Sequence, residues 1–166
     1  MEDGCGGGVS VDMNTIQLLP RARHLIPTVS QWLLSEWPDW YGEDGPGDLS
    51  ADVTAFAASE HTLPIGFVAF DGGIPVGFGA LKAESIPSHR HLTPWAAAGF
   101  VLPARRGQGI GALLLRAIVD HARKLGYEHV YCGTSTSLSL LHRAGWHGVE
   151  GIVHAGQPMI IFCSGP

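Results

Sequence analysis

A strand, a glycine-rich turn and an amphipathic helix follow one another without interruption over residues 100–126. Apolar residues predict a strand up to Val101, and glycines at positions 107, 109 and 111 predict the turn. Apolar residues then recur with a period of 3.6 over Gly109–Leu125, and Gly126 ends this helix. Free N–H groups and the dipole at such a helix start attract phosphate. The segment therefore predicts a phosphate or pyrophosphate site, to which Arg106 adds a charge-assisted contact.

The context of this segment argues against two known phosphate-binding motifs, and an ordinary glycine-rich connector is the alternative to a phosphate site. Gly107-x-Gly109-x-x-Ala112 matches the dinucleotide fingerprint, but residues 102–106 separate it from the strand. The acidic residue expected after the following strand is missing, because Gly133 stands there. No Lys-Ser or Lys-Thr pair follows the glycines, so the segment is not a P-loop.

Length and charge limit the organisation of the chain and its partners. The 166 residues fit one domain, assigned to 14–166, after a flexible glycine-rich leader over 1–13. The net charge of −5 argues against nucleic acid, and no apolar run approaches the length that spans a membrane. The three cysteines form no CxxC pair and the N-terminus has no signal peptide, so we expect a cytoplasmic protein.

The order of predicted elements gives an α/β fold with a mixed sheet covered by helices. The helices are expected over Pro20–Trp37, Asp48–Glu60, Gly109–Leu125 and Ser135–Ala144, with a loop over Trp37–Gly47. The strands are expected over Thr15–Leu19, Ile65–Phe70, Ile74–Leu81, Pro94–Val101, His129–Cys132, Gly151–His154 and Pro158–Cys163.

Two motifs resemble the GNAT N-acetyltransferases. Val101-Leu102-Pro103-x-x-Arg106-x-x-Gly109-x-Gly111 is similar to that family's acetyl-CoA motif, and Leu141-His142-Arg143-Ala144-Gly145-Trp146 is similar to its Y-x-R/K-x-G-F/W segment. The resemblance covers nearly the whole chain. It implies a central mixed sheet in which the parallel strands Trp95–Val101 and His129–Cys132 splay apart, so that acetyl-CoA inserts between them.

The resemblance also implies which residues hold acetyl-CoA. The backbone of Phe100 and Val101 would pair with the pantetheine arm, and Thr134 would contact the cofactor after the fifth strand. The backbone amides over the glycine-rich turn would hold the pyrophosphate; these belong to Gly107, Gln108, Gly109, Ile110, Gly111 and Ala112.

Acetyl transfer to an amine needs a base for the amine and an acid for the leaving thiolate. The family commonly uses a tyrosine as the acid, but this chain has Leu141 at that position. Ser137 lies one turn earlier on the same helix face and is the candidate acid, unless solvent alone serves. Glu84, near the end of the third strand, is the candidate base, although a solvated strand end is the ordinary interpretation. His89 and His91 lack further ligands, and no step needs a metal, so no metal is expected.

The loop over Glu36–Asp48 is acidic and aromatic, and the resemblance places it beside the acceptor site. It contains five carboxylates and no Lys or Arg. Trp37, Trp40 and Tyr41 lie among these carboxylates, which suits a cationic amine through cation–π and charge contacts. Packing of the aromatic rings beneath the loop is the alternative.

The sequence therefore predicts an acetyl-CoA-dependent N-acetyltransferase acting on a primary amine of a small molecule or peptide, by direct attack in a ternary complex. Cys132 and Cys163 are expected to be buried packing residues, which disfavours a covalent cysteine intermediate. Leu141 motivates a rival hypothesis, a non-catalytic acyl-CoA-binding module. A nucleotide-binding oxidoreductase is a third. A homodimer stays open.

Overall fold

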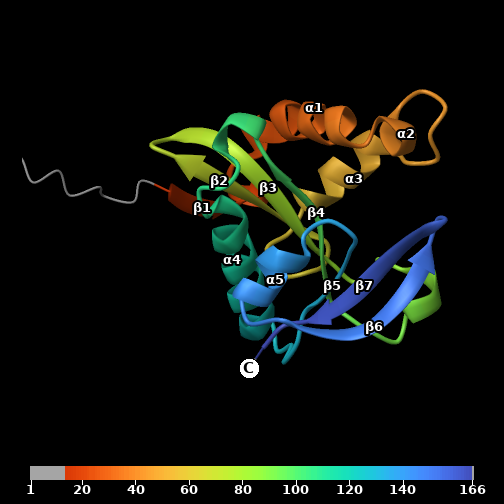
Figure 1. Cartoon of the computed structure of the whole chain (residues 1–166). Helices are drawn as coiled ribbons and strands as arrows, with labels where there is room; N and C mark the ends of the chain where they lie inside the picture. The colour runs from red at the N-terminus through yellow and green to blue at the C-terminus, as the bar shows by residue number, and fades with distance from the viewer. Residues whose placement is uncertain (1–13, 166) are drawn as a thin grey trace, which may run out of the picture.

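The computed structural model describes residues 14–165, which form one seven-stranded mixed sheet with helices on both faces (Figure 1). The strand order is β1-β2-β3-β4-β5-β7-β6. All neighbouring strands are antiparallel except β4 and β5. The mixed sheet flanked by helices is therefore confirmed. The leader expected over 1–13 lies outside the described residues.

The elements have the following bounds. The strands are β1 (Asn14–Leu18), β2 (Ile65–Asp71), β3 (Ile74–Lys82), β4 (Trp95–Val101), β5 (Tyr131–Thr134), β6 (His147–His154) and β7 (Gln157–Cys163). The helices are α1 (Ile26–Glu36), α2 (Pro38–Tyr41), α3 (Leu49–Phe56), α4 (Ile110–Lys124) and α5 (Leu138–Arg143).

The sheet separates two apolar clusters because successive side chains of a strand point to opposite faces. In β2, Phe67 and Ala69 join the cluster beneath α4 and α5, whereas Val68 and Phe70 join the cluster beneath α1 and α3. Figure 1 shows α1, α2 and α3 together on one side of the sheet, and α4 with α5 on the other. Both faces of the sheet are thus covered near β2, β3 and β4.

The first helical region differs from its prediction. Instead of one helix from Pro20, two 3₁₀ turns over Leu19–Arg21 and Arg23–Leu25 precede α1, which begins with Pro27 in its first turn. The expected loop over Trp37–Gly47 contains the short helix α2, again with proline in its first turn. Proline is tolerated in the first turn because N–H groups there have no acceptor within the helix, so the loss of one costs little. Asp48 is the N-cap of α3, and its side chain accepts a hydrogen bond from Ala51 N at 3.0 Å.

Three element boundaries near the C-terminus also differ. The ladder of β5 begins at Tyr131, two residues later than predicted, because Val130 pairs instead with Ser164 through N···Oγ and O···N distances of 2.9 and 2.8 Å. The last helix begins at Leu138 because the preceding residues form a turn around Thr134. Strand β6 begins at His147, four residues earlier than predicted, because it follows β7 along its whole length.

Candidate functional site

The parallel strands β4 and β5 meet at one end and separate beyond it. Their register contains a single pair, Trp95 with Tyr131, supported by a hydrogen bond of 2.9 Å from Tyr131 N to Pro94 O. Trp95 is fully buried and its ring packs on that of Tyr131 at 5.9 Å between centroids. Trp95 is therefore a core residue that holds the two strands together at this point. Beyond Ala96, the edge of β4 that faces β5 pairs with no other strand in residues 14–165.

A β-bulge bends β4 at the start of this unpaired edge. Phe78 pairs with Phe100 and Ala80 pairs with Ala97, so one residue of β3 faces two residues of β4. Ala98 has a φ of 55°, an uncommon conformation for a residue with a side chain. After the extra residue, Gly99 is exposed and Val101 is half-buried.

The register decides which peptide groups of β4 face the gap. Leu102 N donates to Val76 O at 2.9 Å, so Leu102 points its peptide groups towards β3. Because these directions alternate along an antiparallel ladder, Phe100 also points towards β3 and Val101 points into the gap. Of the two residues predicted to pair with pantetheine, only Val101 offers its backbone there. Phe100 instead contributes its ring, which stacks on Trp32 at 5.3 Å.

The turn between β4 and α4 presents backbone N–H groups and no side-chain cap. Gly107 and Gly109 have φ values of 78° and 86°, and Gly109 is the N-cap of α4. A Cβ atom at either position would meet nothing within 4 Å, so the space in front of the turn is open. In residues 14–165, no N–H from Gly107 to Ala112 donates a hydrogen bond. The turn therefore has the geometry of an anion site.

The residues in the first turn of α4 differ in what their side chains do. Ile110 is buried in the main core, which is the apolar cluster beneath α4 and α5. Gly111 lies close to α5, since a Cβ there would be 3.2 Å from Leu140 Cδ2. Gln108 is exposed and donates to Ala104 O at 3.5 Å. These contacts orient the start of α4. The candidate anion site therefore consists of backbone N–H groups.

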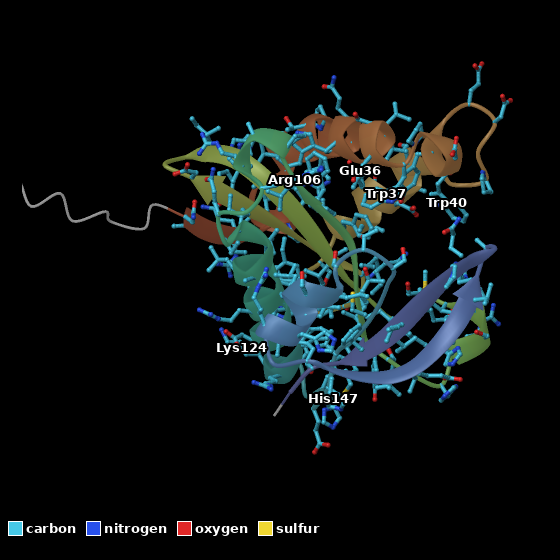
Figure 2. The ribbon with its side chains drawn as sticks, viewed as in Figure 1. Glu36, Trp37, Trp40, Arg106, Lys124 and His147 are labelled. Atoms are coloured by element: carbon cyan, nitrogen blue, oxygen red, sulfur yellow. The ribbon has the colours of Figure 1, made fainter. Side chains whose placement is uncertain are left out.

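The two arginines of the turn are engaged elsewhere. Arg105 forms an ion pair with Asp71. Arg106 donates from Nε to Val101 O at 2.9 Å, and its Nη2 lies 3.5 Å from Glu36 Oε2 at the end of α1 (Figure 2). Its Cζ also lies 5.9 Å from the centroid of Phe100. Arg106 therefore links α1 to β4 and covers one gap-facing carbonyl, a role the sequence did not indicate.

Thr134 and Ser137 lie at the junction of β5 and α5. Thr134 is buried, and its Oγ1 accepts hydrogen bonds from Thr136 N and Ser137 N at 3.2 and 2.9 Å. Ser137 is the N-cap of α5, but its side chain makes no capping bond. Leu141, where the family commonly has tyrosine, is buried in the main core. No hydroxyl is therefore present at that helix position.

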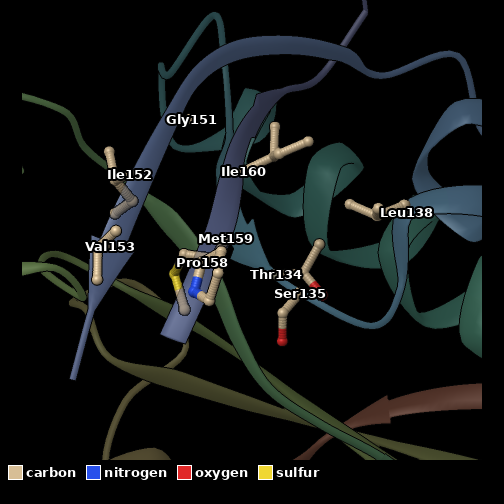
Figure 3. A pocket seen from close by; sticks show the side chains of 9 residues that line it. All are labelled: Thr134, Ser135, Leu138, Gly151, Ile152, Val153, Pro158, Met159 and Ile160. Atoms are coloured by element: carbon tan, nitrogen blue, oxygen red, sulfur yellow. The ribbon is translucent and has the colours of Figure 1, made fainter. Parts of the chain in front are cut away.

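A cavity of about 580 Å³ opens beside this junction (Figure 3). Its walls come from Thr134, Ser135 and Leu138 on one side, and from β6 and β7 on the other. The β7 residues Met159 and Ile160 make it largely apolar. Of the predicted site residues, only Thr134 lines it. The other walls belong to β6 and β7, whose residues were predicted as strands and not as part of a site.

Glu84 lies outside any cluster of functional groups. Its carboxylate is 62% exposed and lies 3.8 Å from the Nε atom of Arg90. The same loop places Ile86 against β5, where a Cβ at Gly133 would lie 2.7 Å from Ile86 Cδ1. The loop between β3 and β4 thus packs over β5, but Glu84 itself stands at its exposed end.

His89 is tied to β6. Its Nε2 lies 2.6 Å from Glu150 Oε2, and its Nδ1 lies 2.7 Å from Ser88 Oγ. The ring of His91 lies 5.6 Å from that of His89. In the part of the chain that the structure describes, no group of three or more His, Cys, Asp or Glu side chains could hold a metal ion.

The three aromatic residues of the acidic loop have different surroundings. Trp37 is half-buried against the cluster beneath α1. Tyr41 donates to Asp52 Oδ2 at 2.7 Å, and desolvation together with this hydrogen bond raises the pKa of Tyr41. Trp40 is 52% exposed, and its indole lies against the backbone of Gly47. Only Trp40 presents much of its ring to solvent, whereas Tyr41 ties α2 to α3.

The two described cysteines are poor nucleophiles. Burial raises the pKa of Cys132 to about 11, and it also raises the pKa of Cys163. The thiolate is the reactive form of cysteine, so almost none is present at neutral pH. Within residues 14–165, no helix has the length and apolar character needed to cross a membrane.

A splayed parallel strand pair, with an uncapped helix start at its open end, has the backbone groups that suit an extended phosphorylated ligand. A family model described as the acetyltransferase (GNAT) family matches residues 26–146. The chain belongs to the GNAT acetyltransferase family, as its motifs indicated. No curated protein sequence matches it significantly.

Three solved structures of similar fold are distant from this chain in sequence. An aminoglycoside 6'-N-acetyltransferase in complex with coenzyme A has a TM-score of 0.72 and 17% identity, and the match covers 90% of this chain and 96% of that one. The yncA protein of Salmonella typhimurium with acetyl-CoA has a TM-score of 0.67 and 20% identity, covering 91% and 92%. An aminoglycoside 6'-N-acetyltransferase from Enterococcus faecium has a TM-score of 0.70 and 17% identity, covering 90% and 96%. At these identities the likeness shows the fold.

Proposed function

We propose that this chain is an acetyl-CoA-dependent N-acetyltransferase that acetylates a primary amine of a small molecule or peptide by direct attack in a ternary complex. The observation that carries the proposal is the free edge of β4 ending at an uncapped helix start. Family membership and the solved structures with coenzyme A or acetyl-CoA support it.

The backbone supplies most of the proposed cofactor site. The N–H groups from Gly107 to Ala112 would hold the pyrophosphate, where the helix dipole favours negative charge. Val101 would pair with the pantetheine amides as a neighbouring strand does. Acetyl-CoA supplies the activated acetyl group. Arg106 would release the carbonyl of Val101 when that carbonyl takes a ligand partner, while its ion pair with Glu36 keeps the guanidinium nearby.

The proposed acid and the proposed base rest on separate observations. Ser137 has a hydroxyl free of any capping bond, one turn before Leu141, and would donate a proton directly or through water. Glu84 would accept the proton of the amine through water, because its carboxylate is exposed. Trp40 and the carboxylates of the acidic loop would attract the protonated amine, with Trp37 behind them and Tyr41 fixing α2.

A second candidate function is a non-catalytic acyl-CoA-binding module. The observation that favours it is Leu141, which is buried in the core and leaves the family's usual acid position without a proton donor. Both functions share the cofactor site, so only turnover distinguishes them.

Thermal unfolding with and without acetyl-CoA tests the shared site, with NAD and ATP as matched controls. Acetyl-CoA should stabilise the chain by about 2.7 kcal/mol at one hundred times its dissociation constant. A screen of amines, read as release of free CoA, then separates the enzyme from the binding module. Stabilisation by NAD without acetyl-CoA would contradict both functions and favour an oxidoreductase. Stabilisation by acetyl-CoA without turnover of any amine would favour the binding module.

Glu84→Gln tests the proposed base, with Arg90→Gln as its matched control. Both substitutions break the same ion pair, but only the first removes the carboxylate. Glu84→Gln should lower the rate about 10²-fold at neutral pH and remove the acidic limb of the pH–rate profile, whereas Arg90→Gln should retain that limb. Identical profiles for the two variants would exclude Glu84 as the base.

A further inference from the structure

Three side chains from the loop between β3 and β4 and from β6 form one hydrogen-bonded chain. Ser88 and His89 lie in the 3₁₀ turn Pro87–His89, and Glu150 lies in β6. Figure 1 shows this loop, in green, beside β6. Ser88 Oγ lies 2.7 Å from Nδ1 of His89, and Glu150 Oε2 lies 2.6 Å from Nε2 of the same ring. The imidazole is therefore held between a hydroxyl and a carboxylate.

The fold positions this chain from both sides. In β6, the bulge between Gly148 and Glu150 shifts the register, and the carboxylate of Glu150 reaches the loop. On the loop side, Ile86 is 4% exposed and belongs with Trp95 to a small apolar cluster. The N–H of His89 donates to the carbonyl of Ile86 at 2.9 Å, so the turn that carries the imidazole is anchored to that cluster.

The two ring nitrogens of His89 face groups of different chemistry. An ionised carboxylate only accepts hydrogen bonds, so Glu150 selects the tautomer of His89 that carries its proton on Nε2. Nδ1 then accepts the hydrogen bond of the Ser88 hydroxyl. The side chain of His89 is only 11% exposed, whereas Ser88 is exposed. A hydroxyl bonded to a base that a third group orients is the arrangement that activates a serine nucleophile.

The backbone at Ser88 supplies a donor for a developing negative charge. In the part of the chain that the structure describes, the N–H of Ser88 donates no hydrogen bond. In serine hydrolases the N–H of the nucleophilic serine stabilises the oxyanion that forms when the hydroxyl attacks a carbonyl carbon. Ser88 therefore offers both the nucleophile and one oxyanion donor.

We propose that Ser88, His89 and Glu150 form a second catalytic site, which hydrolyses small activated esters of short carboxylic acids. An exposed serine suits a small ester whose reactivity does not depend on tight binding. Ser88 and His89 are the catalytic residues, and Glu150 is a positioning residue that holds the ring and balances the charge of the imidazolium. The site uses no acetyl-CoA and is independent of the proposed function.

The reaction has two steps. Ser88 Oγ bonds to the carbonyl carbon of the ester, its proton passes to His89 Nδ1, and the carbonyl electron pair moves to oxygen beside the N–H of Ser88. When this intermediate collapses, the ester C–O bond breaks and the leaving alcohol takes the proton from Nδ1. Water then attacks the acyl-serine with the same base, which releases the carboxylic acid and restores the hydroxyl of Ser88.

Hydrolysis of p-nitrophenyl acetate by the full chain, without acetyl-CoA, tests the proposal. Ser88→Ala removes the nucleophile but leaves the pair of His89 and Glu150, and it should lower the rate about 10²-fold. Ser85→Ala is its matched control, because Ser85 is an exposed serine of the same loop, and it should keep the wild-type rate. Circular dichroism establishes that each variant is folded.

The base and its positioning residue are tested in the same assay. His89→Gln should lower the rate as Ser88→Ala does, whereas the control His91→Gln, which removes an exposed imidazole nearby, should not. Glu150→Gln should lower kcat by at least about 10-fold with KM unchanged, because the imidazolium loses its counter-charge while the surface around Ser88 stays the same.

A fluorophosphonate probe, which reacts with activated serines, should label Ser88, as located by peptide mass spectrometry. A wild-type chain that hydrolyses the ester no faster than folded Ser88→Ala would overturn the proposal. So would a fluorophosphonate that leaves Ser88 unlabelled, or a folded His89→Gln variant that keeps the wild-type rate. Because every assay omits acetyl-CoA and an amine, these outcomes leave the proposed N-acetyltransferase function unaffected.

Discussion

Gly109 illustrates how a residue without a side chain can determine a binding site. It takes a left-handed conformation with φ 86°, which lets the chain leave β4 and enter α4 with its N–H groups facing outwards. The neighbouring arginines are held by Asp71 and Glu36. The proposed anion site thus depends on backbone geometry more than on side-chain charge.

Gly109→Glu should abolish stabilisation by acetyl-CoA, because the carboxylate would oppose the pyrophosphate and occupy its approach. The change should also cost about 1–2 kcal/mol of stability, since a side chain disfavours this conformation. Thermal unfolding with and without acetyl-CoA measures both effects.

Gly126→Glu separates these effects. Gly126 follows the other end of α4 with φ 100° and nothing within 4 Å of its Cβ position, so it carries the same backbone strain. This control should lose stability yet keep the shift with acetyl-CoA. Equal shifts in the two variants would place the phosphates elsewhere.

The sequence identified the glycine-rich turn but not the directions of its side chains. Glycines, the strand and the helix period are local signals, and they predicted the turn and α4 within a residue. The direction of the Phe100 peptide depends on the register with β3, and the position of Arg106 depends on Glu36, which lies 70 residues earlier. Neither partner can be read from the residues around the turn.

At the scale of elements, the junction of β5 and α5 depends on one buried hydroxyl. Thr134 ends β5 and accepts hydrogen bonds from two N–H groups of the next turn. This turn delays α5 to Leu138 and positions Ser135 at the cavity. A side chain with a local structural role therefore also shapes the wall of the candidate site.

Thr134→Val should destabilise the chain by about 1–2 kcal/mol, because it keeps the volume of threonine but removes the acceptor of two N–H groups. The exposed Thr136 is the matched control, and Thr136→Val should change stability by less than about 0.5 kcal/mol. Urea unfolding measures both. Similar losses in the two variants would mean that the hydroxyl of Thr134 does not stabilise the turn.

Elements with strong periodicity were predicted well, whereas boundaries set by distant partners were not. The hairpin between β2 and β3 follows from its Gly72-Gly73 turn, with φ values of 57° and 89°. The start of β6 instead follows from β7, and the start of β5 follows from the pairing of Val130 with Ser164. Such long-range pairs leave no periodic signal in the strand itself.

At the scale of the whole molecule, the sheet consists of two parts joined at one point. Strands β1 to β4 form an antiparallel part, and β5 to β7 form another. One register pair, Trp95 with Tyr131, connects their backbones, and the approach of Gly111 to Leu140 connects their helices. A ligand in the gap between β4 and β5 would touch both parts of the sheet. A ligand on the surface of one part would touch that part alone.

Hydrogen–deuterium exchange with and without acetyl-CoA should therefore show slower exchange on both sides of the gap. The N–H groups over 107–112 and that of Val101 have no partner in residues 14–165, and they should be slowed by up to about 100-fold at one hundred times the dissociation constant. Tyr131–Thr134 should be slowed as well, whereas β6 should change little. Protection confined to 107–112 would mean that the phosphates bind while the gap between β4 and β5 stays empty, and it would contradict the insertion of the cofactor as a strand.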